Sequence, residues 1–169
     1  VNVRQDLGGL NITYTAAERP SAITKGTVHA MLSYNANHER VKMQISDGDN
    51  VTLTRYYLNG NYELDVDGTE ITERLYLGGY YDAPAVLVKH NGQSSVYYIH
   101  RDYLGSVLQI VDTQGKVVEE NSFDAWGCRR DPVTQVVYTA GTAPELMLGR
   151  GFTGHEHLAM FGLINMNAR

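Results

Sequence analysis

The chain has 169 residues and a formal net charge of −5 at pH 7, with a sequence pI near 5.6. This acidic balance gives no electrostatic attraction to nucleic acid or to an anionic membrane surface, so neither is expected as a partner. No run of about 18 apolar residues occurs, so no membrane-spanning helix is expected either.

The first residues, "VNVRQDLGGL", lack an initiator Met and the basic and apolar regions of a signal peptide. We interpret them as a cut end inside a longer chain. The chain has a single cysteine, Cys128, which cannot form a disulfide within the domain.

Tyrosines recur along the first hundred residues at steps of 20 to 22 residues. They are Tyr14, Tyr34, Tyr56, Tyr76 and Tyr97. Each is followed by turn-forming residues and then by an alternating apolar segment, and a step of this length accommodates two strands and a short turn. The sequence therefore predicts tandem β-hairpins, an all-β fold. A β-sandwich or barrel, whose strands are similarly spaced, is the alternative.

Two acidic stretches, "SDGDN" at 46–50 and "DVDGTE" at 65–70, superficially resemble calcium loops. Neither has the EF-hand spacing, and in the second Gly68 follows Asp65 and Asp67 too soon. Both fall where the hairpin period requires a turn, which is the favoured interpretation.

The segment "SVLQIVDTQGKVV" is predicted to be a hairpin with its turn at "DTQG". Alternation places Val107, Gln109 and Val111 on one face and Leu108 and Ile110 on the other. Both faces are apolar, so this part of the sheet is expected to be covered on both sides.

The stretch "SFDAWGCRR" at 122–130 contains the only Trp and the only Cys. A turn is favoured over a catalytic site: Asp124 accepts backbone N–H bonds, Gly127 adopts a positive φ and Trp126 packs on neighbouring hairpins. The adjacent arginines favour a depressed pKa for Cys128, but no spacing identifies a histidine base, so a non-catalytic thiol is expected.

Near the C-terminus, at most one short helical turn is predicted, over 144–148, with Thr142 as its cap. In "GHEHL", a strand would place His155 and His157 on one face and Glu156 on the other. A metal site or a hydrolase centre at these residues is the weaker alternative, because zinc requires three or four converging ligands. No metal, cofactor or catalytic residue is expected.

Residues 97–169 resemble the Rhs or YD-repeat family, at the segment leading into the Rhs-associated core and in its Bacteroides-type version. "YYIHRDYLGSV", "DTQG", "FDAWGCR" and "GFTGHE" match that family's signatures, although Phe123 stands where Tyr is usual. With the looser tyrosine repeats, the proposed structural signature comprises Tyr34, Tyr56, Tyr76, Tyr97, His100, Asp102, Leu104, Gly105, Asp112, Gly115, Phe123, Asp124, Trp126, Gly127, Arg129, Gly154 and Glu156.

The resemblance implies a curved, mainly antiparallel sheet forming part of a shell wall, with hairpin repeats over 1–141 and a linker and truncated core start over 142–169. It implies a non-enzymatic structural segment that helps to enclose a C-terminal polymorphic toxin or effector. Expected partners are the rest of the parent protein and other sheet edges; the expected location is the cell envelope or the exterior. A surface module that binds glycan or protein through Tyr-rich faces is the alternative.

Overall fold

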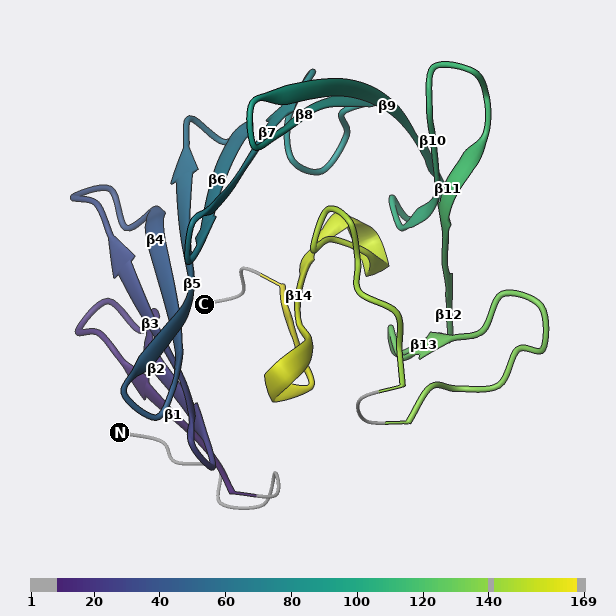
Figure 1. Ribbon diagram of the computed structural model, residues 1–169. Coiled ribbons are helices and arrows are strands. Elements are labelled where there is room, and N and C mark those ends of the chain that lie inside the picture. Colours follow the sequence, from purple (N-terminus) through teal and green to yellow (C-terminus); the bar gives the residue numbers. More distant parts are fainter. Residues whose placement is uncertain (1–8, 140–141, 167–169) are drawn as a thin grey trace. The chain divides into compact units, whose positions relative to one another are not determined.

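The computed structural model describes residues 9–139 and 142–166, and it is built mainly from β-strands (Figure 1). Eleven strands form one antiparallel sheet in which the hydrogen-bonded order is the order of the chain. They are β1 (Leu10–Tyr14), β2 (Pro20–Lys25), β3 (Val28–Tyr34), β4 (Arg40–Asp47), β5 (Asn50–Leu58), β6 (Tyr62–Asp67), β7 (Glu70–Tyr76), β8 (Ala85–His90), β9 (Gln93–Arg101), β10 (Val107–Val111) and β11 (Val117–Glu120).

This topology confirms the predicted tandem hairpins. The five repeated tyrosines lie on the odd-numbered strands β1, β3, β5, β7 and β9, so one tyrosine step is one strand, its turn and the return strand. A β-sandwich would require two sheets packed face to face, whereas these strands belong to a single sheet.

The acidic stretches at 46–50 and 65–70 lie at hairpin turns, as predicted. Strands β4 and β5 are joined through Gly48, with φ of 57°, and β6 and β7 through Gly68, with φ of 56°. The Asp65 side chain belongs to β6 and binds Arg55 with two hydrogen bonds of 2.6 Å, to Nε and Nη2.

The chain divides into two compact units, the first comprising residues up to 73 together with 90–92. Along its strands, buried side chains alternate with more exposed ones, so that one face of the sheet is buried. On that face Ala30 pairs with Ile45 and Leu32 with Met43, and all four are buried. The pairing of β5 with β6 places Arg55 opposite Asp65, and the two form a buried ion pair on this face.

The second unit comprises 74–89 and 93–168. Its core contains sheet residues together with Leu148, a buried residue of the C-terminal segment, by which we mean residues 142–166. The cluster consists of Tyr76, Ala83, Val86, Val88, Ile99, Val107, Ile110 and Leu148. Figure 1 shows the segment, coloured yellow, beside the strands of this unit.

The predicted alternation along β10 is wrong at one point. Val107 and Ile110 were expected on opposite faces, yet both are fully buried members of the same core cluster. The pairing with β9 slips between Val107 and Gln109, and a bulge of this kind puts an extra residue in one strand, which changes the facing of the residues beyond it.

The chain after β11 contains short elements. They are β12 (Ser122–Phe123), β13 (Arg129–Arg130), the 3-10 helix η1 (Phe152–Gly154), β14 (Glu156–Leu158), η2 (Ala159–Phe161) and β15 (Leu163–Asn165). β12 pairs with β13, and β14 pairs with β15.

The helical turn allowed over 144–148 does not form. The segment turns between Leu146 and Gly149, whose N–H donates to the Leu146 carbonyl at 2.9 Å. Side chains take up its other backbone groups: Arg129 Nη1 donates to the Pro144 carbonyl, and Glu119 Oε2 accepts from Met147 N–H at 2.6 Å. These bonds replace those that would close a helix.

None of the helical segments described is long or apolar enough to cross a lipid bilayer. The predicted boundary between 141 and 142 adjoins residues 140–141, which lie outside the described residues, as do 1–8 and 167–169. That boundary stays a prediction, and so does the interpretation of the first residues as a cut end.

Candidate functional site

The predicted turn at Asp124 joins β12 to β13. Asp124 Oδ1 accepts from the backbone N–H groups of Trp126 and Cys128, each at 2.8 Å, as an aspartate at the start of a tight turn does. The Gly127 N–H donates to the Asp124 carbonyl at 3.1 Å, and the Asp124 N–H donates to the Cys128 carbonyl at 3.0 Å. The hydrogen bonds that the Asp124 carboxylate accepts lower its pKa, and the bond from the Cys128 N–H has the largest effect.

Gly127 is required at this turn for two reasons. Its φ is +83°, a conformation that disfavours residues with a Cβ. A Cβ built there would also lie 2.7 Å from Ile164 Cδ1 and 2.8 Å from Phe152 Cδ1. The turn therefore presses its backbone directly against the C-terminal segment.

The same turn recurs at two other predicted aspartates. Asp102 Oδ1 accepts from Leu104 N–H at 2.9 Å and Ser106 N–H at 2.7 Å, while Asp112 Oδ1 accepts from Gln114 and Lys116 N–H, both at 2.9 Å. In each turn a glycine with positive φ stands three residues after the aspartate: Gly105 at +87° and Gly115 at +80°. We call Asp102–Ser106, Asp112–Lys116 and Asp124–Cys128 the aspartate turns.

A related turn at Asn35 was visible only as a loose repeat. Asn35 Oδ1 accepts from Asn37 N–H at 2.9 Å and Glu39 N–H at 3.0 Å, and His38 takes the position with positive φ. The "YN" dipeptide at 34–35 and the "FD" dipeptide at 123–124 thus form closely similar turns.

Two expectations about the turn at 122–130 are wrong. Trp126 does not pack on neighbouring hairpins, because it lies at the tip of the turn and is 86% exposed. The pKa of Cys128 is raised rather than depressed, by desolvation and by the adjacent Asp124 carboxylate, to which its thiol donates. A raised pKa reduces the thiolate fraction, so the residue is poorly suited to act as a nucleophile.

The remaining signature residues lie in different environments. Tyr76 is 1% exposed, Tyr34 and Tyr97 are half-buried, and Tyr56 and His100 are exposed. The Tyr34 hydroxyl donates to the Pro20 carbonyl at 2.7 Å, tying β3 to the start of β2.

Arg150, which the sequence reasoning missed, holds the C-terminal segment in the second unit. Its side chain is buried, and its guanidinium lies 4.3 Å from the ring centre of Tyr80, 5.7 Å from that of Tyr81 and 5.8 Å from that of Tyr76. Such cation–π contacts strengthen when the cation is desolvated. Nothing in the local sequence around Arg150 indicates that three tyrosines converge on the arginine.

Glu156 and Gly154, two signature residues, lie in this same region. Glu156 is 1% exposed and faces Arg150 across an isolated antiparallel bridge. Gly154 has φ of +71°, and a Cβ there would lie 3.2 Å from Arg101 Nη1. Arg101 Nη1 in turn donates to the Gly105 carbonyl at 3.0 Å, which links the segment to the first aspartate turn.

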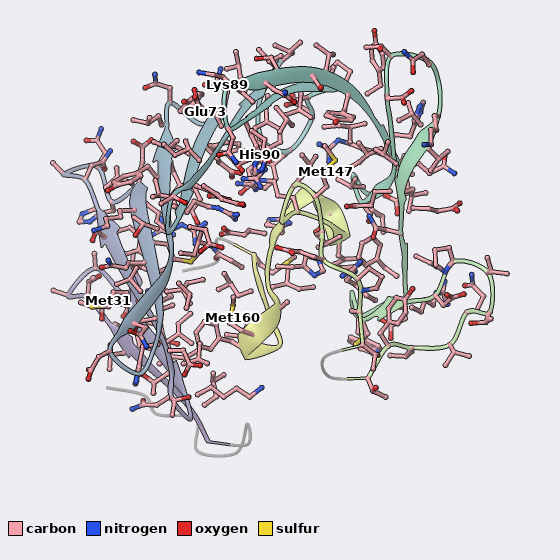
Figure 2. All side chains as sticks on the ribbon, viewed as in Figure 1. Met31, Glu73, Lys89, His90, Met147 and Met160 are labelled. Carbon is pink, nitrogen blue, oxygen red and sulfur yellow. The ribbon has the colours of Figure 1, made fainter. Side chains whose placement is uncertain are left out.

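A second attachment holds residues 144–147. Arg129 donates to the Pro144 carbonyl and to Asn121 Oδ1, the latter at 3.1 Å, and Asn121 Nδ2 donates to Glu119 Oε1 at 2.6 Å. Glu119 also accepts from Met147 N–H. Met147 is labelled in Figure 2. Arg129 was predicted as a signature residue, and this network is its structural context.

His155 and His157 are engaged by separate neighbours. His155 Nδ1 is 2.8 Å from Thr153 Oγ1, and its ring lies 5.0 Å from that of Tyr81. His157 Nε2 accepts from Phe152 N–H at 3.0 Å, and its ring lies 5.7 Å from that of Phe123. Among the residues that the structure describes, no three His, Cys, Asp or Glu side chains converge as a metal site would require.

Burial lowers the pKa of both histidines. For His157 the pKa falls to about 4, chiefly through desolvation and then through the nearby Arg129 cation. His155 shifts in the same direction, because of burial first. At neutral pH both rings are uncharged and serve as packing and hydrogen-bonding groups.

The exposed aromatic side chains lie on separate elements. Tyr14 is on β1, Tyr56 on β5 and Tyr98 on β9, Tyr81 lies between β7 and β8, and Tyr103 and Trp126 are in aspartate turns. The binding-module alternative stays a prediction.

Comparisons with known proteins find this fold within much longer chains. No family model matches the sequence. The chain is 26% identical over 126 residues to the tRNA3(Ser)-specific nuclease WapA of Bacillus spizizenii, a match covering 71% of this chain and 5% of that protein.

Solved structures of TcdB2-TccC3 share the fold over nearly the whole chain. One gives a TM-score of 0.69 at 16% identity, covering 92% of this chain and 8% of that chain. The Photorhabdus luminescens Tc holotoxin pore gives a TM-score of 0.68 with the same identity and coverage. The chain therefore spans only a small part of the proteins it resembles.

Proposed function

We propose that this chain is a non-enzymatic structural segment of an Rhs/YD-repeat protein, forming part of a β-shell that encloses a C-terminal toxin or effector. The observation that carries the proposal is the fold shared with TcdB2-TccC3 over 92% of the chain. The distant match to WapA, a nuclease of far greater length, is consistent with a toxin-bearing parent.

The geometry suits a wall. Each hairpin adds two strands to a sheet that grows in chain order, and two of the aspartate turns join β9 to β10 and β10 to β11 without long loops. A wall built this way extends by repetition, since each unit buries its apolar face only beside its neighbours.

The side chains once considered for catalysis support a structural role. His157 accepts a backbone hydrogen bond, His155 packs on Tyr81, and Cys128 has a raised pKa beside Asp124. Each of these groups is occupied in holding the C-terminal segment or its adjoining turn.

The partners in this proposal are the remaining core and C-terminal cargo of the parent protein, with sheet edges as a further site of self-association. The proposed location is the cell envelope or the exterior. The signature residues, the boundary near 142 and the Bacteroides-type assignment belong to the same proposal.

Limited proteolysis of the full-length parent tests enclosure. We expect the polypeptide downstream of this segment to resist a protease in the native protein and to be cut rapidly once urea opens the wall. An unfolded reference protein in the same reaction shows that the protease is active. Cleavage of the downstream polypeptide at equal rates before and after urea would contradict the proposal.

A further inference from the structure

The first unit contains two hairpin turns in which an Asn-Gly dipeptide has positive φ at both residues. Asn59 and Gly60 have φ of 51° and 70°, and Asn91 and Gly92 have φ of 47° and 88°. Positive φ at both residues is a conformation that Asn-Gly favours. All four residues are exposed.

The two turns differ in what surrounds the asparagine amide. Asn91 Oδ1 accepts from Ile71 N–H at 3.0 Å, and Asn91 Nδ2 lies 3.3 Å from His90 Nε2. Among the residues that the structure describes, none forms a hydrogen bond with the side chain of Asn59.

His90 is itself oriented by its neighbours. His90 Nδ1 lies 2.8 Å from Thr72 Oγ1, and Nε2 lies 3.9 Å from Glu70 Oε2. His90 is at the end of β8, where Figure 2 labels it. In a protonated imidazole, Nε2 is a donor 3.3 Å from the amide nitrogen, which can accept its proton once Cγ becomes tetrahedral during the reaction.

We propose that Asn91 is a site of spontaneous deamidation that its own turn accelerates. The Ile71 N–H is placed to stabilise negative charge developing on Oδ1, as an oxyanion-hole donor does. His90 is placed to protonate the departing nitrogen, as a general acid does. Gly92, which has no side chain to obstruct approach, supplies the attacking backbone nitrogen.

The reaction consumes water and needs no other reactant. The Gly92 nitrogen loses its proton to solvent and bonds to Asn91 Cγ; the Cγ–Nδ2 bond breaks, and Nδ2 leaves as ammonia with a proton from His90 Nε2. Solvent then returns a proton to His90. Water opens the resulting cyclic imide at one of its two carbonyls, which leaves aspartate or isoaspartate at position 91.

Asn59 provides an internal reference, since it belongs to the same dipeptide, has positive φ at both residues and is likewise exposed. The His90 side chain is 53% exposed, so water competes with it and the gain is smaller than the ~100-fold that a well-placed general acid contributes. We expect position 91 to convert roughly ten-fold faster than position 59 in the folded chain.

Peptide mass spectrometry of the full chain, incubated at neutral pH and sampled over weeks, measures both positions in one sample. His90→Gln should slow conversion at position 91 markedly toward the rate at position 59, while the Ile71 N–H donor remains in place. The matched control is His29→Gln, which removes a histidine with a similar threonine contact, 3.1 Å from Thr24 Oγ1, but without an adjacent Asn-Gly. It should leave both rates unchanged.

In urea the folded geometry is lost, so positions 59 and 91 should convert at similar rates. The proposal is overturned if position 59 converts as fast as position 91 in the folded chain. It is also overturned if His90→Gln leaves position 91 unaffected, or if the advantage of position 91 persists in urea.

Discussion

Acidification is expected to weaken the second unit through His157. The ring is packed beside Phe123, and Nε2 accepts the Phe152 N–H at 3.0 Å, a bond that protonation of Nε2 abolishes. Arg129 and the neighbouring His155 further disfavour a charge here, and Glu156 only partly offsets them. The folded protein therefore holds the pKa of His157 at about 4, against an ordinary value of 6.5.

The sign and size of the effect follow from proton linkage. Between pH 4 and 6.5 the unfolded chain binds more protons at this histidine than the folded chain, so the free energy of unfolding falls as pH falls. The contribution is fully present above about pH 6.5 and is lost by about pH 4. The full difference corresponds to about 3 kcal/mol, and about 2 kcal/mol is lost by pH 5, as upper bounds because the ring is partly solvated.

Urea unfolding at pH 7.5 and pH 5, followed by circular dichroism, measures this loss. His157→Gln retains a hydrogen-bond acceptor that does not titrate, so this variant should lose less stability on acidification than the wild type, by up to about 2 kcal/mol. His100→Gln, at an exposed site, is the matched control and should behave as the wild type. Equal losses in the wild type and His157→Gln would refute the reasoning.

Three further substitutions test the turns and the docked segment. Gly127→Ala should lower the free energy of unfolding in urea by about 2 to 4 kcal/mol, because the positive φ strains the backbone and the new Cβ overpacks the contact with the C-terminal segment. Gly115→Ala has open space around its Cβ and should lose only the ~1 kcal/mol of backbone strain. Equal losses would show that the segment does not press on the turn. Asp124→Ala should lower the melting temperature more than Asp49→Ala, which lies at another exposed turn. Asp124→Asn keeps an oxygen acceptor and should retain most of the stability at neutral pH. Equal melting temperatures of the two alanine variants would contradict the stabilising role of the Asp124 hydrogen bonds. Arg150→Met should destabilise by about 2 kcal/mol and speed amide exchange at Leu148, and unchanged exchange would argue against the tyrosine contacts as the anchor.

Local sequence chemistry was enough to predict the hairpins and their turns. The tyrosine steps identify successive odd-numbered strands because a strand, a turn and a return strand have nearly constant length. The roles of Asp124 and Gly127 could also be predicted from the sequence, since an aspartate followed three residues later by glycine is typical of one tight turn.

Features set by tertiary context were not predictable in this way. The bulge in β10 arises from its pairing with β9, so strict alternation misplaced Ile110 relative to Val107. Arg150 gains its role from tyrosines about seventy residues earlier in the chain, a convergence that no local spacing reveals. The raised pKa of Cys128 is likewise a property of the folded turn, which desolvates the thiol and brings it to the Asp124 carboxylate.

The most direct test of the account is electron cryomicroscopy of the full-length parent protein. We predict that residues 9–166 form part of a continuous β-wall around a closed interior, and that this interior holds density for the downstream polypeptide. An open sheet with the downstream polypeptide outside it would contradict the claim that this chain is a wall segment of a shell.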